Sequence, residues 1–428
     1  MELHDHESPT SLDIGALHCR NGAIPQLRAP MKSAEEHPVS KIPKVLLLVE
    51  SSRGSGRSLL QGIARYAHHC GPWSCYWEPA GLEKAWPKLK ASDLDGIILR
   101  DVEQLDEVLA FGIPAVVIGH GRTEVPGLVN VVTESSKVAQ LAAAHLLACG
   151  FKNFAYCGFT ASLADDPPWS QLRRQSFVDC IRQAGWSCHD FSTPASAARS
   201  SWQRERTLMV RWLQSLPKPL GLMAANDDRA RQLVEACKVA EILVPSQVGV
   251  IGVDNDELVC GLSDPPLSSL ALNFDRAGYE AASALDSLMH HRGTVPARIL
   301  VHPTHAVVRR STDVVAVEDK SLAKALRYIR DATRQQQLTV ANVASYAGMS
   351  RRLLEQKLRR ELGHSVLDEI RRVRTDKVAQ MLVETQLSIS EIAEALGFIE
   401  VQHFARYFRA VKNMSPLAYR KKFAGYSA

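Results

Sequence analysis

The sequence predicts an α/β body followed by an all-α domain, and three observations lead to this prediction. Short apolar segments of strand length alternate with amphipathic helical segments from Lys44 to about Phe274. Beyond Asp313 the strand pattern stops, and apolar residues recur with the 3.6-residue period of helices. This C-terminal part also contains one pattern twice. The chain has 428 residues, which is long enough for two or three domains with cores of their own.

The predicted strands of the body are short and almost wholly apolar. They lie at residues 44–49, 96–99, 115–118, 154–158, 221–225 and 248–253. Helical patterns occupy residues 59–67 and 138–149, and Gly150 closes the second of these. Strands that are apolar on both faces and are separated by helices are typical of parallel sheets covered on both sides. The body is therefore expected to be built from βαβ units.

Composition and charge limit the possible classes of protein. Hydrophobic residues make up 46% of the chain and charged residues 23%, as is usual for globular proteins. No apolar run approaches the roughly 18 residues of a membrane span, so no membrane partner is expected. Residues 1–42 are rich in Pro, His and Ser and lack the pattern of a secretion signal, which predicts a disordered tail. Nine cysteines without a Cys-x-x-Cys pair favour reduced thiols in the cytoplasm.

The charge is unevenly distributed along the chain. The segment 320–428 carries 20 Lys and Arg residues against 10 Asp and Glu residues, although the net charge of the whole chain is only +5. The preceding residues are therefore net acidic. A basic quarter joined to an acidic body is typical of a nucleic-acid-binding module. A solvated basic face would give the same count, so charge alone does not decide.

The C-terminal segment contains an internal repeat with a spacing of 49 residues. The matched pairs are Leu338 and Leu387, Val343 and Ile392, Ala344 and Ala393, Gly348 and Gly397, Met349 and Phe398, Lys357 and Arg406, and Arg360 and Arg409. In each copy Thr339 or Ser388 is placed to cap a first helix. The small alanine suits a close helix crossing, and the glycine suits a turn with positive φ. Each copy is therefore predicted to be a helix-turn-helix, with Ser350 or Glu400 opening the second helix.

The second helix of each copy supplies the candidate DNA-contacting residues. Arg pairs with guanine and Gln with adenine in the major groove. The candidates are Arg351, Arg352, Gln356, Gln402, His403 and Arg406. Phe404 and Phe408 are expected in the core. The alternative is a helical bundle without a DNA role, and two copies in the basic part of the chain favour DNA binding.

These residues resemble a known DNA-binding family. Residues 388–398 (Ser-Ile-Ser-Glu-Ile-Ala-Glu-Ala-Leu-Gly-Phe), the Phe404-x-Arg406-x-Phe408 pattern, and Ser415-Pro416 followed by Tyr419-Arg420 are similar to the AraC/XylS DNA-binding domain. Asn413 stands where that family usually has Gly, and Leu358 where the first copy often has Phe. Both are fold positions.

Alternative chemistries for the body have weaker support. Residues 52–58 (Ser-Arg-Gly-Ser-Gly-Arg-Ser) follow a strand and precede a helix, as a phosphate-binding loop would. Leu59 replaces the third glycine of the dinucleotide pattern and no Gly-Lys-Ser/Thr is present, so a plain strand-to-helix turn is favoured. The paired histidines at 68–69 and 290–291, and the His-Asp-His run at 4–6, lack further ligands at metal-binding spacing. We expect no catalytic residues, no metal and no cofactor.

The body resembles the two-lobed, periplasmic-binding-protein-like ligand domain of LacI/GalR regulators. Residues 225–227 (Ala-Asn-Asp) and 251–254 (Ile-Gly-Val-Asp) match motifs of that family at predicted strand ends, where open α/β sheets present ligands. The resemblance implies that Asp254, Asn226 and Arg173 bind a sugar, with Arg174 adjacent to the last. Asp and Asn also cap helices and brace loops, which is the alternative. Trp77 or Trp169 is a candidate to cover a sugar ring.

The order of the two modules reverses that of a Lac-type regulator. The resemblance implies a tail at 1–42, a two-lobed sugar-binding domain at 43–313 and an AraC-type DNA-binding domain at 314–428. It implies a cytoplasmic homodimer that binds promoter DNA, responds to a pentose effector, acts with RNA polymerase and activates pentose (xylose-type) catabolic genes. The alternatives are a response to a different sugar, a body that only dimerises, and a nucleotide-dependent enzyme with a regulatory domain.

Overall fold

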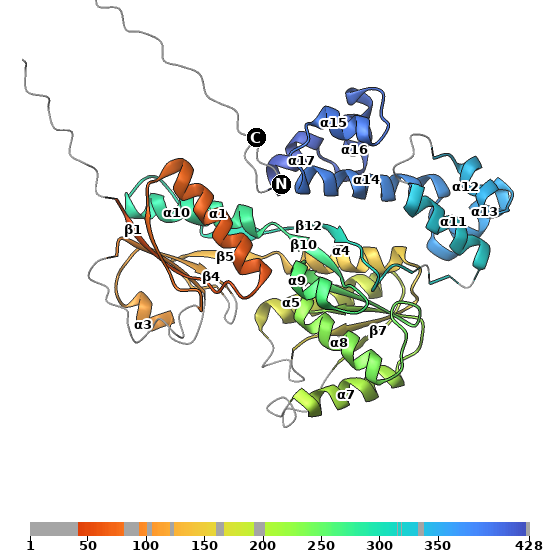
Figure 1. Ribbon diagram of the computed structural model, residues 1–428, viewed down its shortest axis with the longest axis horizontal. Coiled ribbons are helices and arrows are strands. Elements are labelled where there is room, and N and C mark those ends of the chain that lie inside the picture. The colour runs from red at the N-terminus through yellow and green to blue at the C-terminus, as the bar shows by residue number, and fades with distance from the viewer. Residues whose placement is uncertain are drawn as a thin grey trace, which may run out of the picture. The chain divides into compact units, whose positions relative to one another are not determined.

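The computed structural model describes residues 42–80, 94–100, 105–119, 124–159, 167–191, 202–314, 316–317, 319–332 and 338–424. This part of the chain forms two six-stranded sheets and, after the last strand, a helical C-terminal region (Figure 1). The α/β class with a following all-α region is therefore confirmed. The tail predicted at 1–42 lies, except for Ile42, outside the described residues.

The first sheet forms one lobe of the body and has the strand order β11-β5-β4-β3-β1-β2, with every pairing parallel. Its strands are β1 (Lys44–Leu48), β2 (Ser74–Trp77), β3 (Gly96–Arg100), β4 (Ala115–Ile118), β5 (Val129–Thr133) and β11 (Arg298–Val301). Alternate residues of β1 enter different cores: Val45 and Leu47 lie in one cluster, and Leu46 and Leu48 in another. This two-residue alternation follows from strand geometry and places apolar contacts on both faces.

Helices α1 (Gly54–Cys70) and α10 (Phe274–Met289) pack closely together over this sheet, and Figure 1 shows them side by side. Glycines make the approach possible. A Cβ atom at Gly62 would lie 1.8 Å from the carbonyl oxygen of Asp275, and one at Gly278 would lie 2.0 Å from that of Leu59. The short helix α3 (Leu105–Leu109) contributes Leu105 to the core on the other face.

The second lobe has the strand order β12-β10-β9-β8-β6-β7. Its strands are β6 (Asn153–Cys157), β7 (Cys188–Asp190), β8 (Leu220–Ala224), β9 (Val248–Asp254), β10 (Ser268–Leu272) and β12 (Pro303–Val307). Only the β10–β12 pair is antiparallel. The helices of this lobe are α4 (Ser135–Ala148), α5 (Pro168–Gln183), α7 (Trp202–Ser215), α8 (Asp227–Val239) and α9 (Glu257–Leu262). Phe154 and Tyr156 pack in the cluster that includes α4 and α5, and Ala155 and Cys157 in the cluster that includes α7 and α8.

Within the described residues, the chain passes between the lobes at three single residues. Glu134 separates β5 from α4, Asn273 separates β10 from α10, and His302 separates β11 from β12. His302 is hydrogen-bonded to both of the other two. Nδ1 of His302 lies 2.5 Å from Oε2 of Glu134, and the backbone N–H of His302 donates to Oδ1 of Asn273 at 2.6 Å. The crossings are therefore joined into one compact junction.

Seven helices make up the C-terminal region of the described chain. They are α11 (Lys320–Asp331), α12 (Val340–Tyr346), α13 (Arg351–Leu362), α14 (Val366–Glu384), α15 (Ile389–Ala395), α16 (Val401–Lys412) and α17 (Pro416–Phe423). The apolar residues of α11 to α13 form one core and those of α15 to α17 another, and α14 contributes residues to both. No helix in the described part of the chain is long and apolar enough to cross a membrane.

Candidate effector site and DNA-binding surface

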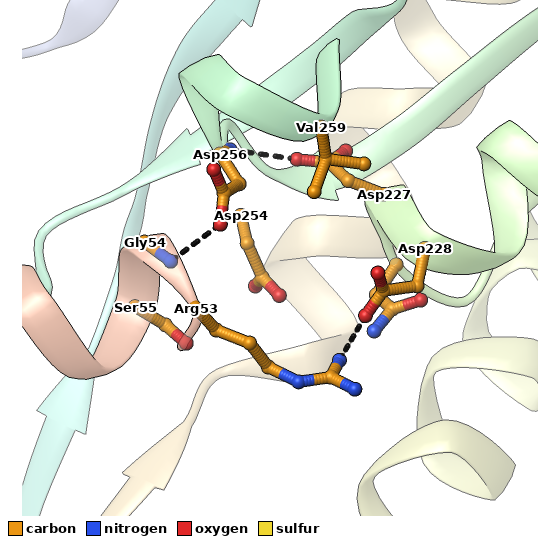
Figure 2. Close-up of a pocket in the computed structure, with 9 residues that line it drawn as sticks. Arg53, Gly54, Ser55, Asp227, Asp228, Asp254, Asp256 and Val259 are labelled. Atoms are coloured by element: carbon orange, nitrogen blue, oxygen red, sulfur yellow. Dashed lines mark hydrogen bonds and ion pairs between the residues drawn. The ribbon is translucent and has the colours of Figure 1, made fainter. Parts of the chain in front are cut away.

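A small pocket lies where the two lobes of the body face each other, at the carboxyl ends of strands from both sheets (Figure 2). The first lobe contributes the start of α1 and the residue before it. The second lobe contributes residues that follow β8 and β9. The lining residues are Arg53, Gly54, Ser55, Asn226, Asp227, Asp228, Asp254, Asp256 and Val259. Carboxyl ends of parallel strands are the usual position for ligands in open α/β sheets.

Polar contacts connect the two lobes across this pocket. The backbone N–H of Gly54 donates to Oδ2 of Asp256 at 2.5 Å, and Nη2 of Arg57 lies 3.2 Å from Oδ1 of the same residue. Arg53 forms an ion pair with Asp228, and Figure 2 shows its side chain extending toward the second lobe. These contacts hold the pocket in a closed arrangement.

Asp254 is the last residue of β9 and faces the pocket (Figure 2). Its φ of 101° lies in a region that L-residues seldom adopt and that Asp and Asn tolerate better than most. Burial raises the pKa of Asp254 to about 6, and the nearby guanidinium groups of Arg173, Arg100 and Arg53 oppose that rise. A carboxylate among arginines can accept hydroxyl hydrogen bonds while its charge is balanced.

Arg173 projects from α5 and is almost fully buried, with 2% of its surface exposed. One Nη donates to the carbonyl oxygen of Ala225, and the guanidinium carbon lies 4.8 Å from the ring centroid of Trp169. Its Nε has no hydrogen-bond partner among the described residues. The neighbouring Arg174 instead forms an ion pair with Asp190. Of the two adjacent arginines, Arg173 is therefore the one placed near the carboxyl end of β8.

Asn226 lines the pocket and also caps a helix. Its Oδ1 accepts a hydrogen bond from the backbone N–H of Arg229 at 3.0 Å, which makes it the N-cap of α8. Asn226 therefore caps a helix, which was the alternative to sugar binding, and it also lies in the pocket. Trp77 lies on β2, is 48% exposed and donates from Nε1 to the carbonyl oxygen of Val49 at 3.0 Å. It does not line this pocket.

Several pocket residues were not among the sequence candidates. Asp227 is buried and accepts hydrogen bonds from the hydroxyl of Ser269 at 2.6 Å and the backbone N–H of Asp256 at 2.8 Å. Burial, followed by the charge of Asp254, raises the pKa of Asp227 well above its usual value. The sequence could have indicated Asp256, because residues 254–257 are mostly acidic and follow an apolar strand.

The turn from β1 to α1 occupies residues 49–53, and residues 54–58 of the predicted turn already belong to α1. A Cβ atom at Gly56 would lie 2.0 Å from the carbonyl oxygen of Glu50, so glycine permits α1 to start beside β1. No group of three or more His, Cys, Asp or Glu side chains suited to a metal occurs among the described residues.

Both predicted helix-turn-helix motifs are present. Thr339 caps α12 and Ser388 caps α15 through their hydroxyl groups, and Ser350 caps α13. The turns contain Gly348 and Gly397 with φ values of 67° and 74°. These left-handed positions suit glycine. The helix-turn-helix pairs are therefore α12 with α13 and α15 with α16.

The predicted repeat spacing of 49 residues is only partly correct. It holds for the first helices and the turn glycines, but α13 begins at Arg351 and α16 at Val401, which is a spacing of 50. The buried residues of these second helices follow the longer spacing, since Leu354 and Leu358 correspond to Phe404 and Phe408. The expected matches of Lys357 with Arg406 and Arg360 with Arg409 are therefore wrong, because one extra residue lies in the second turn.

The second helices present polar side chains on the surface. Phe404 and Phe408 are fully buried, as predicted, so the opposite face of α16 is exposed. All six predicted DNA-contacting residues are exposed: Arg351, Arg352, Gln356, Gln402, His403 and Arg406. Exposure is required for base contacts and does not by itself assign them.

Helix α14, which connects the two motifs, contains a buried ion cluster. Glu369 has no exposed surface and accepts hydrogen bonds from Arg372 at 2.7 and 2.9 Å and from His364 at 3.0 Å. Burial alone would raise its pKa, but hydrogen bonds from His364 and Arg372 lower the pKa of Glu369 to about 2. The carboxylate is thus held ionised inside the domain.

Comparison with known proteins agrees with both halves of this architecture. Residues 143–312 match a family described as a periplasmic binding protein-like domain, and residues 343–422 match a helix-turn-helix domain. The chain is a DNA-binding transcription regulator that joins a domain of the first kind to one of the second, and it is not an enzyme.

The chain is similar to xylose operon regulatory proteins over both of its modules. It is 29% identical over 387 residues to the xylose operon regulatory protein of Escherichia coli K12, covering 89% of this chain and 97% of that protein. It is 28% identical to the corresponding protein of Haemophilus influenzae, covering 88% and 98%. A solved structure of the xylose-binding transcription activator XylR matches with a TM-score of 0.56 at 28% identity, covering 90% of this chain and 99% of that one.

Proposed function

We propose that this chain is a cytoplasmic homodimeric regulator that binds a pentose of the xylose type between its lobes and activates the genes for its catabolism. The observation that carries the proposal is the similarity to xylose operon regulatory proteins over both modules of the chain. The pocket supports it, because Asp254 and Asn226 offer oxygen and amide groups that match sugar hydroxyls.

In this proposal Asp254, Asn226 and Arg173 bind the sugar. Asp254 accepts two hydroxyl hydrogen bonds, and Arg173 donates from a buried guanidinium whose Nε is unpaired among the described residues. Trp169 lies beneath that guanidinium and fixes its orientation. A sugar in the pocket would touch residues of both lobes at once and therefore favour the closed arrangement over an open one.

The proposed domain limits are 43–313 for the effector domain and 314–428 for the DNA-binding domain. They are supported by the end of the last strand, β12, at Val307 and the start of α11 at Lys320. In the dimer, lobe closure would change the separation of the two DNA-binding domains and so their register on promoter half-sites. Bound at a promoter, the regulator would then recruit RNA polymerase.

Binding of a sugar panel to the purified full chain tests this proposal. Thermal-shift and calorimetric titrations should show saturable stabilisation by one pentose and weaker or no stabilisation by hexoses. Asp254→Asn, which keeps a residue that tolerates positive φ, should weaken binding of that sugar by about 1–3 kcal/mol while leaving basal DNA binding unchanged. If no sugar stabilises the wild-type chain, the assignment of a sugar effector is wrong, and a body domain that only dimerises becomes the better account.

A further inference from the structure

The extra residue in the second helix-turn-helix is Ile399. In the first motif four residues separate α12 from α13, and in the second motif five residues separate α15 from α16. Phe398 occupies the place of Met349, since both follow the turn glycine and pack in the core of their motif. Ile399 therefore stands between this core residue and Glu400, the N-cap of α16, with no counterpart in the first motif.

The side chain of Ile399 lies almost entirely outside the core of the protein. It is 97% exposed, the largest value for any large hydrophobic residue in the described chain. The adjacent Phe398 is only 8% exposed and lies with its ring centroid 5.2 Å from that of Phe404. The core of the motif is thus already filled by Phe398, and folding alone does not explain an isoleucine at position 399.

Ile399 lies just before the predicted base-reading residues of α16. Gln402 and His403 follow at intervals of three and four residues, and Arg406 at an interval of seven. Within α16 the side chains of Gln402, His403 and Arg406 lie along one face of the helix, and Ile399 directly precedes its N-cap, Glu400. All four side chains are exposed, while Phe404 and Phe408 occupy the opposite, buried face. Ile399 therefore lies in the turn at the N-terminal end of α16, the end whose residues contact base edges in helix-turn-helix complexes.

We propose that Ile399 contacts the C5-methyl group of a thymine in the major groove and so helps to determine the sequence that the second motif selects. The thymine methyl is the apolar group that base edges present in the major groove, and aliphatic side chains recognise it by contact. The corresponding turn of the first motif ends at Ser350 and continues with Arg351 and Arg352, which suit polar readout. The two motifs would then read their half-sites by different chemistry. This inference rests on the placement of α16 in the major groove.

The experiment starts from the DNA sequences that the full-length protein selects from a random duplex library. Each thymine of a selected duplex is then replaced by deoxyuridine, which removes only the methyl group. Affinities of the wild-type chain and of Ile399→Ala are measured on every duplex. Leu417→Ala is the matched control, since Leu417 is 47% exposed and lies on α17, outside both motifs.

At one thymine position, deoxyuridine should weaken wild-type binding about four-fold, the factor that corresponds to burying one methyl group. Ile399→Ala should bind the thymine duplex more weakly by a similar factor or more, and should lose its sensitivity to deoxyuridine at that position alone. Leu417→Ala should behave as wild type. Because Ile399 is exposed, the melting temperature of Ile399→Ala should not change.

Two results would overturn the inference while leaving the regulator assignment intact. One is a deoxyuridine effect that is the same in wild type and Ile399→Ala at every thymine. The other is unchanged operator affinity with loss of transcription activation in Ile399→Ala, which would place Ile399 against RNA polymerase instead of DNA. If the full chain selects no preferred sequence at all, sequence-specific regulation itself is contradicted, and the inference with it.

Discussion

Asp256 of the second lobe accepts a hydrogen bond at 2.5 Å from the backbone N–H of Gly54 in the first lobe. The two residues are 202 positions apart in the chain. Oδ1 of Asp256 also accepts from the backbone N–H of Leu258 at 3.1 Å and so caps α9. One carboxylate therefore connects the end of β9 to the start of α1, directly beside the proposed sugar-binding residues.

The ion pair between Arg57 and Asp256 should influence how readily the lobes close. Partly exposed ion pairs contribute up to about 1 kcal/mol. Arg57→Gln should therefore favour open lobes and raise the effector concentration for half-saturation by up to about five-fold. Small-angle X-ray scattering and calorimetry measure the two effects. Arg65→Gln is the control, because Arg65 pairs with Asp275 within the first lobe at 2.7 Å. Equal shifts in both variants would contradict a specific role for Arg57.

The pKa of Asp254, raised to about 6 by burial, predicts a pH dependence of stability. Between about pH 4 and pH 6 the folded chain binds more protons at this group than the unfolded chain, so the unfolding free energy falls as pH rises through this window. The fall due to Asp254 amounts to at most about 3 kcal/mol. Asp254→Asn keeps a residue that tolerates positive φ and removes the titrating group. Urea unfolding at pH 4.5 and 6.5 should show a smaller fall in this variant. The other charged groups near Asp254, including Arg53, Arg100, Arg173 and Asp228, are common to both proteins.

Predicted base contacts on α13 and α16 can be separated from general charge effects. Arg351→Ala and Gln402→Ala should each weaken binding to a selected operator by about 1–3 kcal/mol, with less effect on a scrambled duplex. Arg327→Ala on α11 removes an exposed positive charge outside both motifs and serves as the control. Fluorescence anisotropy with both duplexes measures the difference. A melting-temperature loss that accounts for the weaker binding would show that the residue supports the fold.

The buried Glu369 predicts acid sensitivity of the DNA-binding domain. Its pKa of about 2 lies below the ordinary value, so its stabilising contribution is complete above about pH 4.5 and is lost as pH falls toward 2. Glu369→Gln should lower the unfolding free energy at neutral pH by about 3 kcal/mol, because Arg372 and His364 lose their charged partner and one of its two acceptor oxygens becomes a donor. Asp376→Asn should cost less than about 1 kcal/mol, since Asp376 is 45% exposed. Chemical denaturation followed by circular dichroism compares them. Equal losses would contradict the special position of Glu369.

The fold class and the strands β1, β3, β4, β6, β8 and β9 could be predicted from sequence, whereas β2, β5, β7, β10, β11 and β12 were not. Buried strands such as β4 are continuous apolar runs, and their limits were predicted to within one residue. Strand β2 was missed because it lies at a sheet edge with Cys75, Tyr76 and Trp77 exposed, so it lacks such a run. The one-residue shift in the second helices was missed because the exposed Arg and Lys residues gave a false match. The buried Phe404 and Phe408 define the register instead.

Only those site residues that lie in recognisable local motifs could be predicted from the sequence. Asp254 and Asn226 follow strands in recognisable motifs and do line one pocket. Asp256 and Arg53 were not predicted, because their roles depend on partners in the opposite lobe. The choice between Arg173 and Arg174 could not be made from sequence, since only packing shows which of two adjacent arginines is buried.

The junction formed by Glu134, Asn273 and His302 limits the kinds of motion that a ligand can produce. His302 is hydrogen-bonded to both other crossings, so the three adjacent crossings resist sliding and twisting and leave rotation about one shared axis as the soft direction. The opening angle between the lobes is then the structural change that the effector domain passes on to the DNA-binding domains. Two sugars that reach the same angle are indistinguishable to the DNA, and one that stops partway would act as a partial agonist.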